Sequence, residues 1–287
     1  MPSEIFPIIL NSTNVVPGDL NTYVYKFPRN SINLKNASIC LHTINLYYSW
    51  SNVDVALYNN NKFQVFFPDS TGGTNYDVVL PDGNYEVSDI NAYMQKVFID
   101  NGLYHINNTT GQYRYYMELK INPITYSVDN VSANVPTSTP TGYSDPPGGF
   151  APGKGYPVAP EPTFINILSN NFGKLIGFTN GLHADHSSDF TPQIAEVSSV
   201  FVRCSLVNNK FTNPPDIIYA FTAGGKKFGE MLSIENQNLI FSSVPDGMYS
   251  EVKITLTDQE YRKLNIKDTN LIIYLVLQIQ DQNVKAN

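Results

Sequence analysis

The chain has 287 residues, of which 42% are hydrophobic and only 15% charged, and its 18 basic and 25 acidic residues give a net charge of −7. This length can hold one large β domain or two smaller ones around a substantial core. The charge argues against direct, tight nucleic-acid binding, because such binding needs clustered cations and no basic run exceeds Lys226-Lys227. The 19 Tyr and 16 Phe residues favour strands, and the 18 Gly and 19 Pro residues supply turns.

The start of the chain carries no targeting signal, because residues 1–4 contain no basic region followed by an apolar run. The longest apolar stretch, residues 271–277, is much shorter than a membrane span. We therefore expect a protein that is neither secreted by a signal peptide nor inserted in a membrane. Cys40 and Cys204 lie inside expected strands, so they predict reduced, buried thiols and no disulfide framework.

In the first half of the chain, strand patterns surround one helix. Residues 37–48 are apolar on both faces, so this strand has to be covered on both sides. Residues 112–120 alternate between apolar and polar side chains, as a half-exposed strand does. Between them, an amphipathic helix is expected behind Ser88 as its N-cap. Its apolar side chains follow the helical spacing: Ile90, Tyr93, Met94, Val97 and Phe98.

The segment 131–163 has a different composition, with eight prolines and five glycines and no periodicity. Proline removes backbone donors and glycine costs conformational entropy, so we expect an exposed insertion or a flexible linker. The sequence thus predicts a first part of one domain over residues 1–130, this insertion, and a second part of the same domain over residues 164–287.

Beyond the insertion, short helical turns are expected near residues 172–176 and after Asp258. Residues 198–207 and 271–279 are apolar on both faces, whereas residues 251–257 alternate strictly. Strands that are apolar on both faces require two packed sheets or a neighbouring subunit. The expected fold is therefore all-β, a jelly-roll β-sandwich with one or two short helices and a Pro/Gly-rich insertion.

Searches for catalytic motifs find none. The chain contains no Gly-x-Ser-x-Gly and no His-x-His, and its glycines at 153–155 and 224–225 lack the spacing of a phosphate-binding loop. Cys40 and His42 share one face of a strand, but side chains two apart on a strand are about 7 Å apart, which favours a buried thiol beside a satisfied histidine. We expect no catalytic residues and no cofactor.

Histidines cluster once, where His183 and His186 lie beside Asp185 and Asp189. A His-x-x-His pair with carboxylates could bind a divalent metal on a helical turn. No Cys, Glu or third His lies nearby, and the segment has the composition of a polar loop. The sequence therefore predicts no metal site.

Several neutral strings form a family signature that spans the chain from about Phe6 to Gln278. They are INLYYSWSN (44–52), YNNNKF (58–63), YEVSDINAY (85–93), NGLY (101–104), FGKLIGF (172–178), FTPQI (190–194) and CSLVNN (204–209). In this order they resemble the penton, or minor capsid, proteins of virophages and Maverick/Polinton-type viruses. The resemblance implies a jelly roll that forms homopentamers at the fivefold vertices of an icosahedral capsid, beside a major capsid protein of the double jelly-roll type. It also implies assembly in the host cell interior and a final location in the virion.

Subunit contacts of this kind favour aromatic anchors, for which Tyr47, Tyr48 and Trp50 are the candidates, although Tyr and Trp also pack sandwich cores. An alternative function is a carbohydrate-binding or host-attachment β-sandwich module, in which tyrosine-rich loops stack on a host surface glycan. An enzyme ranks third, because it would need carboxylates brought together from distant strands.

Overall fold

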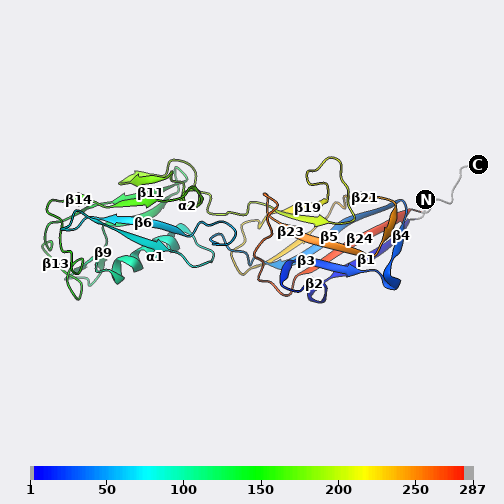
Figure 1. Cartoon of the computed structure of the whole chain (residues 1–287), viewed down its shortest axis with the longest axis horizontal. Helices are drawn as coiled ribbons and strands as arrows, with labels where there is room; N and C mark the ends of the chain where they lie inside the picture. Colours follow the sequence, from blue (N-terminus) through cyan, green and yellow to red (C-terminus); the bar gives the residue numbers. More distant parts are fainter. Residues whose placement is uncertain (1–2, 281–287) are drawn as a thin grey trace, which may run out of the picture. The chain divides into compact units, whose positions relative to one another are not determined.

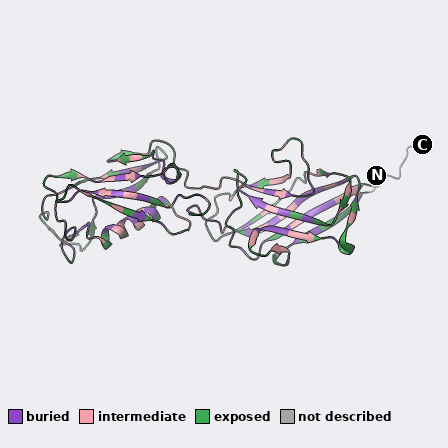
Figure 2. Cartoon of the chain, in the orientation of Figure 1, coloured by how far each residue is buried: buried purple, intermediate pink, exposed green. Residues whose placement is uncertain are grey.

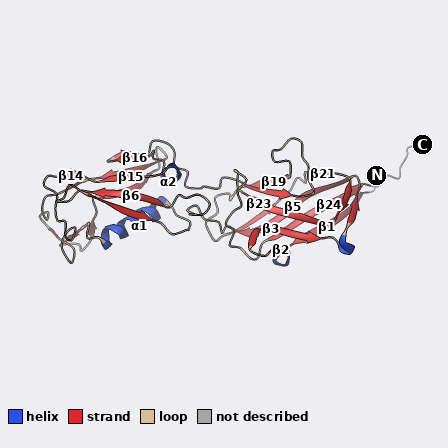
Figure 3. Cartoon of the chain, in the orientation of Figure 1, coloured by secondary structure: helices blue, strands red, loops and turns tan. Residues whose placement is uncertain are grey.

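The computed structural model describes residues 3–280, and it is built from antiparallel sheets with two short α-helices (Figures 1 and 3). The expected all-β class is thereby confirmed. The chain forms two compact units: unit 1 comprises residues 1–50 and 197–287, and unit 2 comprises residues 51–196. These boundaries differ from the expected ones at 130/131 and 163/164, because composition detects irregular chain and not which segments pack together.

Unit 1 is a β-sandwich of two sheets. The first sheet has the order β1 (Ser3–Leu10), β24 (Ile272–Gln280), β5 (Ala37–Tyr47) and β20 (Met231–Glu235), and β21 (Ser242–Val244) also pairs with β5. The second sheet has the order β19 (Ile217–Phe221), β18 (Val200–Cys204), β23 (Glu251–Thr257), β3 (Asp19–Lys26) and β2 (Val15–Val16). A small ladder joins β22 (Gly247–Tyr249) to β4 (Ile32–Leu34), and two 3-10 turns complete the unit: Ser12–Asn14 and Pro28–Asn30.

The connectivity of unit 1 is that of a jelly roll. If its eight principal strands, β1, β3, β5, β18, β19, β20, β23 and β24, are counted in chain order, the first sheet reads 1-8-3-6 and the second reads 2-7-4-5. This strand order belongs to the double-sheet jelly roll, in which two Greek keys wrap around one core. Unit 2 is inserted between the third and fourth of these strands, β5 and β18.

Side-chain alternation places the core of unit 1 between its sheets, as Figure 2 shows along the strands. On β23, Val252, Ile254 and Leu256 are buried while Glu251 and Lys253 are exposed. On β5, the inward residues Leu41 and Ile44 are three apart, which an unbroken strand would send to opposite faces. A bulge opposite Tyr274 and Leu275 leaves His42 as the extra residue and keeps both side chains in the core.

Unit 2 contains four small sheets. They are β16 (Gly181–His183), β15 (Phe164–Ile167), β6 (Lys62–Phe67) and β7 (Thr74–Val79); β10 (Met117–Asn122), β11 (Ser127–Ser132) and β17 (His186–Ser187); β13 (Tyr143–Ser144), β8 (His105–Asn107) and β9 (Tyr113–Arg114); and β12 (Asn134–Val135) with β14 (Glu161–Pro162). The strand expected over 112–120 is thus divided between β9 and β10. The core of unit 2 is separate from that of unit 1 and rich in aromatic rings, including Phe63, Phe67, Phe98, Tyr116 and Phe172.

Both expected helices of unit 2 are present. α1 (Val87–Asp100) buries Ile90, Met94 and Phe98, but its N-cap is Glu86 and not Ser88. The Glu86 amide donates to Asp89 Oδ2 at 2.8 Å, which places the carboxylate in the first turn, where a helix favours negative charge. α2 (Asn170–Ile176) begins at Ser169 and ends at Gly177, whose φ of 84° suits a glycine C-cap. Neither α-helix has the length and apolar character needed to cross a membrane.

One local expectation is wrong. The segment after Asp258 is a turn without helix, because the Asp258 carboxylate accepts the amides of Glu260 and Arg262 at 2.8 and 2.9 Å and Tyr261 adopts a φ of 64°. The Pro/Gly-rich segment 131–163 exposes many of its residues, but it also contributes Val135 and Phe150 to the core of unit 2. Its prolines and glycines shape the turns of this loop.

Candidate functional site

One face of unit 1 exposes a large number of apolar side chains. On β1, Ile8 and Leu10 point into the core, so the alternation of the strand sends Ile5 and Ile9 outward. Ile5 is 60% exposed and Met231 is 51% exposed. We call this surface the apolar sheet face and define it by the apolar outward residues on β1, β24, β5 and β20 that are at least partly exposed: Ile5, Pro7, Ile9, Tyr47, Met231, Ile272 and Tyr274.

The strand register brings side chains of the apolar sheet face together in pairs. Ile9 is opposite Tyr274, and Met231 is opposite Tyr47, whereas Ile272 is opposite Asn45, a polar residue of the same face. Directly opposed side chains on one face of a sheet lie about 5 Å apart and interact. Clustered exposed apolar side chains of this kind mark a site of interaction with another molecule.

The expected interface residues occupy three different environments. Tyr47 is 40% exposed and lies on the apolar sheet face, where its amide donates to Asp268 Oδ2 at 2.7 Å. Tyr48 is half-buried and packs between Phe228 and Trp50. Trp50 is 2% exposed and belongs to the core of unit 1. Of the three, Tyr47 therefore offers the most surface to a partner.

Sequence reasoning missed most of the apolar sheet face. Ile272 lies in the segment 271–279, which is apolar on both faces and is therefore expected to be covered on both sides, whereas no strand is predicted over Ile5 and Ile9. The jelly roll covers only the inner side of the strands that carry these residues. The sequence did contain one relevant signal. A strand that is apolar on both faces needs cover on both sides, and a neighbouring subunit can cover the side that the fold leaves exposed.

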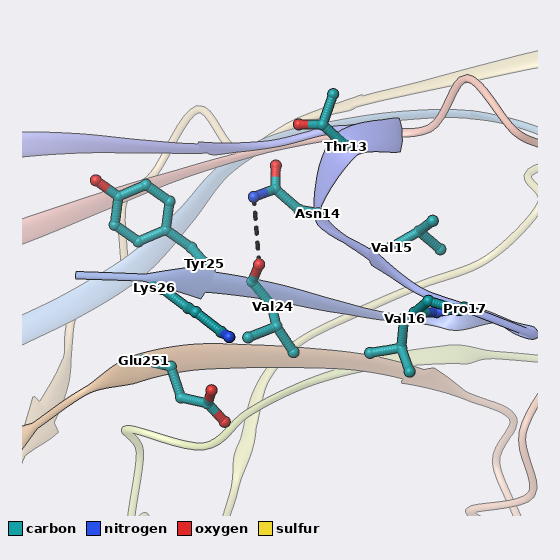
Figure 4. Close-up of a pocket in the computed structure, with 9 residues that line it drawn as sticks. All are labelled: Thr13, Asn14, Val15, Val16, Pro17, Val24, Tyr25, Lys26 and Glu251. Atoms are coloured by element: carbon teal, nitrogen blue, oxygen red, sulfur yellow. Dashed lines mark hydrogen bonds between the residues drawn. The ribbon is translucent and has the colours of Figure 1, made fainter. Parts of the chain in front are cut away.

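A groove lies at one edge of the second sheet, where the pairing of β2 with β3 stops at Tyr23 (Figure 4). The side-chain amide of Asn14 donates to the carbonyl of Val24 at 3.2 Å and spans part of this edge. The groove brings one ammonium, Lys26, and one carboxylate, Glu251, near apolar residues. Its lining consists of Thr13, Asn14, Val15, Val16, Pro17, Val24, Tyr25, Lys26 and Glu251.

A buried histidine of unit 2 fixes the Pro/Gly-rich segment. The hydroxyl of Tyr156 donates to Asp145 Oδ1 at 2.5 Å, because a carboxylate can only accept, and it therefore accepts from His105 Nε2 at 2.8 Å. His105 Nδ1 is then left to accept from the Tyr116 hydroxyl at 2.8 Å. Burial lowers the pKa of His105 and raises the pKa of Tyr116 to about 12, so both groups stay neutral near pH 7.

This hydrogen-bonded chain is an anchor and not a reaction centre. His105 is fully buried, and its ring stacks on Phe150 with centroids 4.7 Å apart. Two of the groups that it holds, Asp145 and Tyr156, come from the segment expected to be an exposed insertion. The network thus explains why that segment packs against unit 2 despite its composition.

The two cysteines are not reactive thiols. Both are buried, and burial raises the pKa of Cys204 to about 12 and also raises that of Cys40. His42 bonds Thr43 Oγ1 at 2.6 Å, and its ring meets that of Tyr274 edge-on. The satisfied histidine that the sequence favoured is therefore observed.

A second group of histidines lies at the surface of unit 2. A ring nitrogen of His183, a ring nitrogen of His186 and a carboxylate oxygen of Asp189 lie within 4.8 Å of one another. Asp185 points elsewhere, since its Oδ1 is 3.4 Å from the amide of Ser132. Asp189 accepts hydrogen bonds from Thr179 and His186, and these bonds hold its pKa at about 2.

No family model and no curated protein matches the chain. Among the solved structures, one match is the crystal structure of the selenomethionine-labelled mavirus penton protein. The match covers 97% of this chain and 99% of that chain, with a TM-score of 0.49 and 8% sequence identity.

Proposed function

We propose that the chain is a structural capsid protein, a penton that forms homopentamers at the fivefold vertices of an icosahedral virus capsid. The family strings between residues 44 and 209 suggest this class. The observation that carries the proposal is the apolar sheet face, which is exposed on a sandwich whose own core is already closed. A major capsid protein of the double jelly-roll type is the second partner, and the virion is the location.

A ring of five requires two different surfaces on each subunit, because one patch meets another patch on the neighbour and the rotation closes. The apolar sheet face is one such surface. The other is a loop patch defined by Phe211 and Ile240, which line a shallow hollow of unit 1. Phe211 is 98% exposed, an unusual state for a phenylalanine in a soluble subunit. Tyr47 and Met231 on the apolar sheet face and Phe211 on the loop patch are residue types that suit an interface core.

The double variant Met231→Lys/Ile272→Lys tests this proposal. Two lysines buried without partners in a subunit contact should weaken association at least about a hundredfold, equivalent to about 3 kcal/mol. We expect sedimentation to show a loss of pentamers, and particle imaging to show empty vertices when the variant is made together with the major capsid protein. Circular dichroism should be unchanged, because both side chains are exposed in the subunit.

Ile124→Lys is the matched control, since Ile124 is also an exposed isoleucine but lies in the β10–β11 hairpin of unit 2. It should leave pentamers intact. A wild-type protein that remains monomeric and is absent from vertices would refute the penton role, and normal pentamers of the double variant would refute the assigned face.

A second role, binding of a host surface glycan, is favoured by a tyrosine cluster on unit 2. Tyr104 and Tyr113 have ring centroids 4.5 Å apart, and Tyr113 is exposed next to Arg114 and Gln95. Exposed aromatic rings beside polar groups suit sugar rings, which stack and hydrogen-bond together. Glycan-array binding that Tyr113→Ala abolishes and Tyr126→Ala leaves intact would support this role, because Tyr126 is an exposed tyrosine of the β10–β11 hairpin that does not belong to this cluster. A wild-type protein that binds no glycan would refute it.

A further inference from the structure

Three metal-ligating side chains converge in one turn of unit 2. His183 ends β16, His186 begins β17, and Asp189 follows two residues after β17. One potential ligand atom of each lies within 4.8 Å of the other two, and the rings of the two histidines are parallel to within 8°. The sequence already showed the two histidines, but it did not show that Asp189 turns back to join them as a third ligand.

Thr179 fixes the tautomer and the orientation of His183. The ring nitrogen Nε2 of His183 lies 2.8 Å from the backbone carbonyl of Thr179. Because a carbonyl oxygen only accepts, Nε2 carries the hydrogen, and Nδ1 of the neutral ring keeps its lone pair. A histidine that ligates a metal through one nitrogen almost always donates the other N–H to a carbonyl or a carboxylate. His183 already has this arrangement.

Thr179 also orients Asp189. Oδ2 of Asp189 accepts the Thr179 amide at 2.8 Å and the Thr179 hydroxyl at 2.7 Å. Its other oxygen, Oδ1, faces His186 Nε2 at 3.0 Å. Around a tetrahedral ion with bonds of about 2.1 Å, ligand atoms lie roughly 3.4 Å apart, so this pair needs little movement to bind a shared ion.

We propose that His183, His186 and Asp189 bind one divalent transition-metal ion of the Zn²⁺ class. Two imidazole nitrogens and one carboxylate oxygen are ligands that zinc and its neighbours prefer over Mg²⁺ or Ca²⁺. The ion replaces the hydrogen between His186 Nε2 and Asp189 Oδ1. The remaining position is open to water, since His186 and Asp189 are exposed. The bound ion joins β16, β17 and the loop that follows them.

Isothermal titration calorimetry of the full-length, tag-free chain with ZnCl₂ tests the site. We expect one ion per chain, and intense visible absorption with Co²⁺, as a tetrahedral site gives. His186→Ala should remove this binding. Thr179→Val keeps the backbone amide and carbonyl but loses the hydroxyl bond to Asp189, and it should weaken binding at least about tenfold.

Asp185→Asn is the matched control, because it removes a carboxylate from the same turn that does not belong to the cluster. It should bind Zn²⁺ as the wild type does. Thermal melts with and without Zn²⁺ provide a second measurement, because an ion bound to the folded state raises the melting temperature. Absence of saturable binding by the wild type, or equal binding by His186→Ala, would overturn the proposal.

Discussion

Replacing Asn52 with alanine should lower the free energy of unfolding of unit 2 by about 3 to 5 kcal/mol. Asn52 is buried, and its amide donates to the carbonyls of Tyr85 and Ile194, both at 2.8 Å, while its Oδ1 accepts the Tyr85 amide at 2.9 Å. Alanine leaves these three backbone groups without a partner. Each buried, unpaired group costs about 1 to 3 kcal/mol, and some of this cost is recovered by water that enters.

Denaturant unfolding of the variant would measure this loss. Asn61→Ala is the matched control, because Asn61 is a half-buried asparagine nearby whose amide makes one 3.2 Å bond to the carbonyl of Leu80. The control should lose about 1 kcal/mol. Asn52 and Ile194 lie near the two ends of unit 2, so the hydrogen bond between them joins these ends. Equal losses of unfolding free energy for the two variants would show that this joining does not stabilise unit 2.

Phe67→Ala should destabilise unit 2 by about 3 to 5 kcal/mol, because a fully buried ring leaves a cavity that its surroundings fill only partly. Phe67 is on β6, and its ring lies 6.1 Å from that of Phe98 on α1 and 5.9 Å from that of Phe150 in the Pro/Gly-rich segment. The side chain therefore joins a strand, a helix and a loop. Its removal should loosen all three at once.

Hydrogen exchange of backbone amides would locate the effect. Peptides from residues 51–196 should exchange faster, whereas peptides from β5 and β24 should not, because the two cores share no buried residue among those described. Phe66→Ala is the control, since the neighbouring ring points to the other face of β6 and is only half-buried. A uniform increase over the whole chain would contradict two separate cores.

The sequence predicted best the elements whose pattern depends only on neighbouring residues. The alternation over residues 251–257 coincides with β23, and apolar spacing found α1, although the alternation over residues 112–120 is divided between β9 and β10. The sequence Pro-Asp-Gly occurs at residues 81–83 and 245–247, and the chain bends at the aspartate of each. In each a tyrosine hydroxyl donates to the proline carbonyl, Tyr85 to Pro81 and Tyr249 to Pro245. Turn chemistry of this kind is equally local.

Features that depend on distant residues were not predictable. Nothing near Trp50 indicates that its ring packs in the core while Tyr47 stays exposed. The burial of Phe150 requires His105, which lies 45 positions earlier and contacts its ring. The cluster of His183, His186 and Asp189 failed the sequence criteria for the same reason, because the bonds from Thr179 that place Asp189 span ten residues.

The pairing of β1 with β24 bears on how the protein forms during synthesis. Ile8 is opposite Leu275, so β1 cannot complete its pairing in this sheet until β24, much later in the chain, has been made. Unit 2 needs no such delay, because residues 51–196 are continuous and can fold as soon as they emerge. Once folded, unit 2 fixes the distance between the two ends of its own segment. The flexible part of the connection between β5 and β18 is then short. A shorter flexible connection lowers the entropy cost of closing the sandwich.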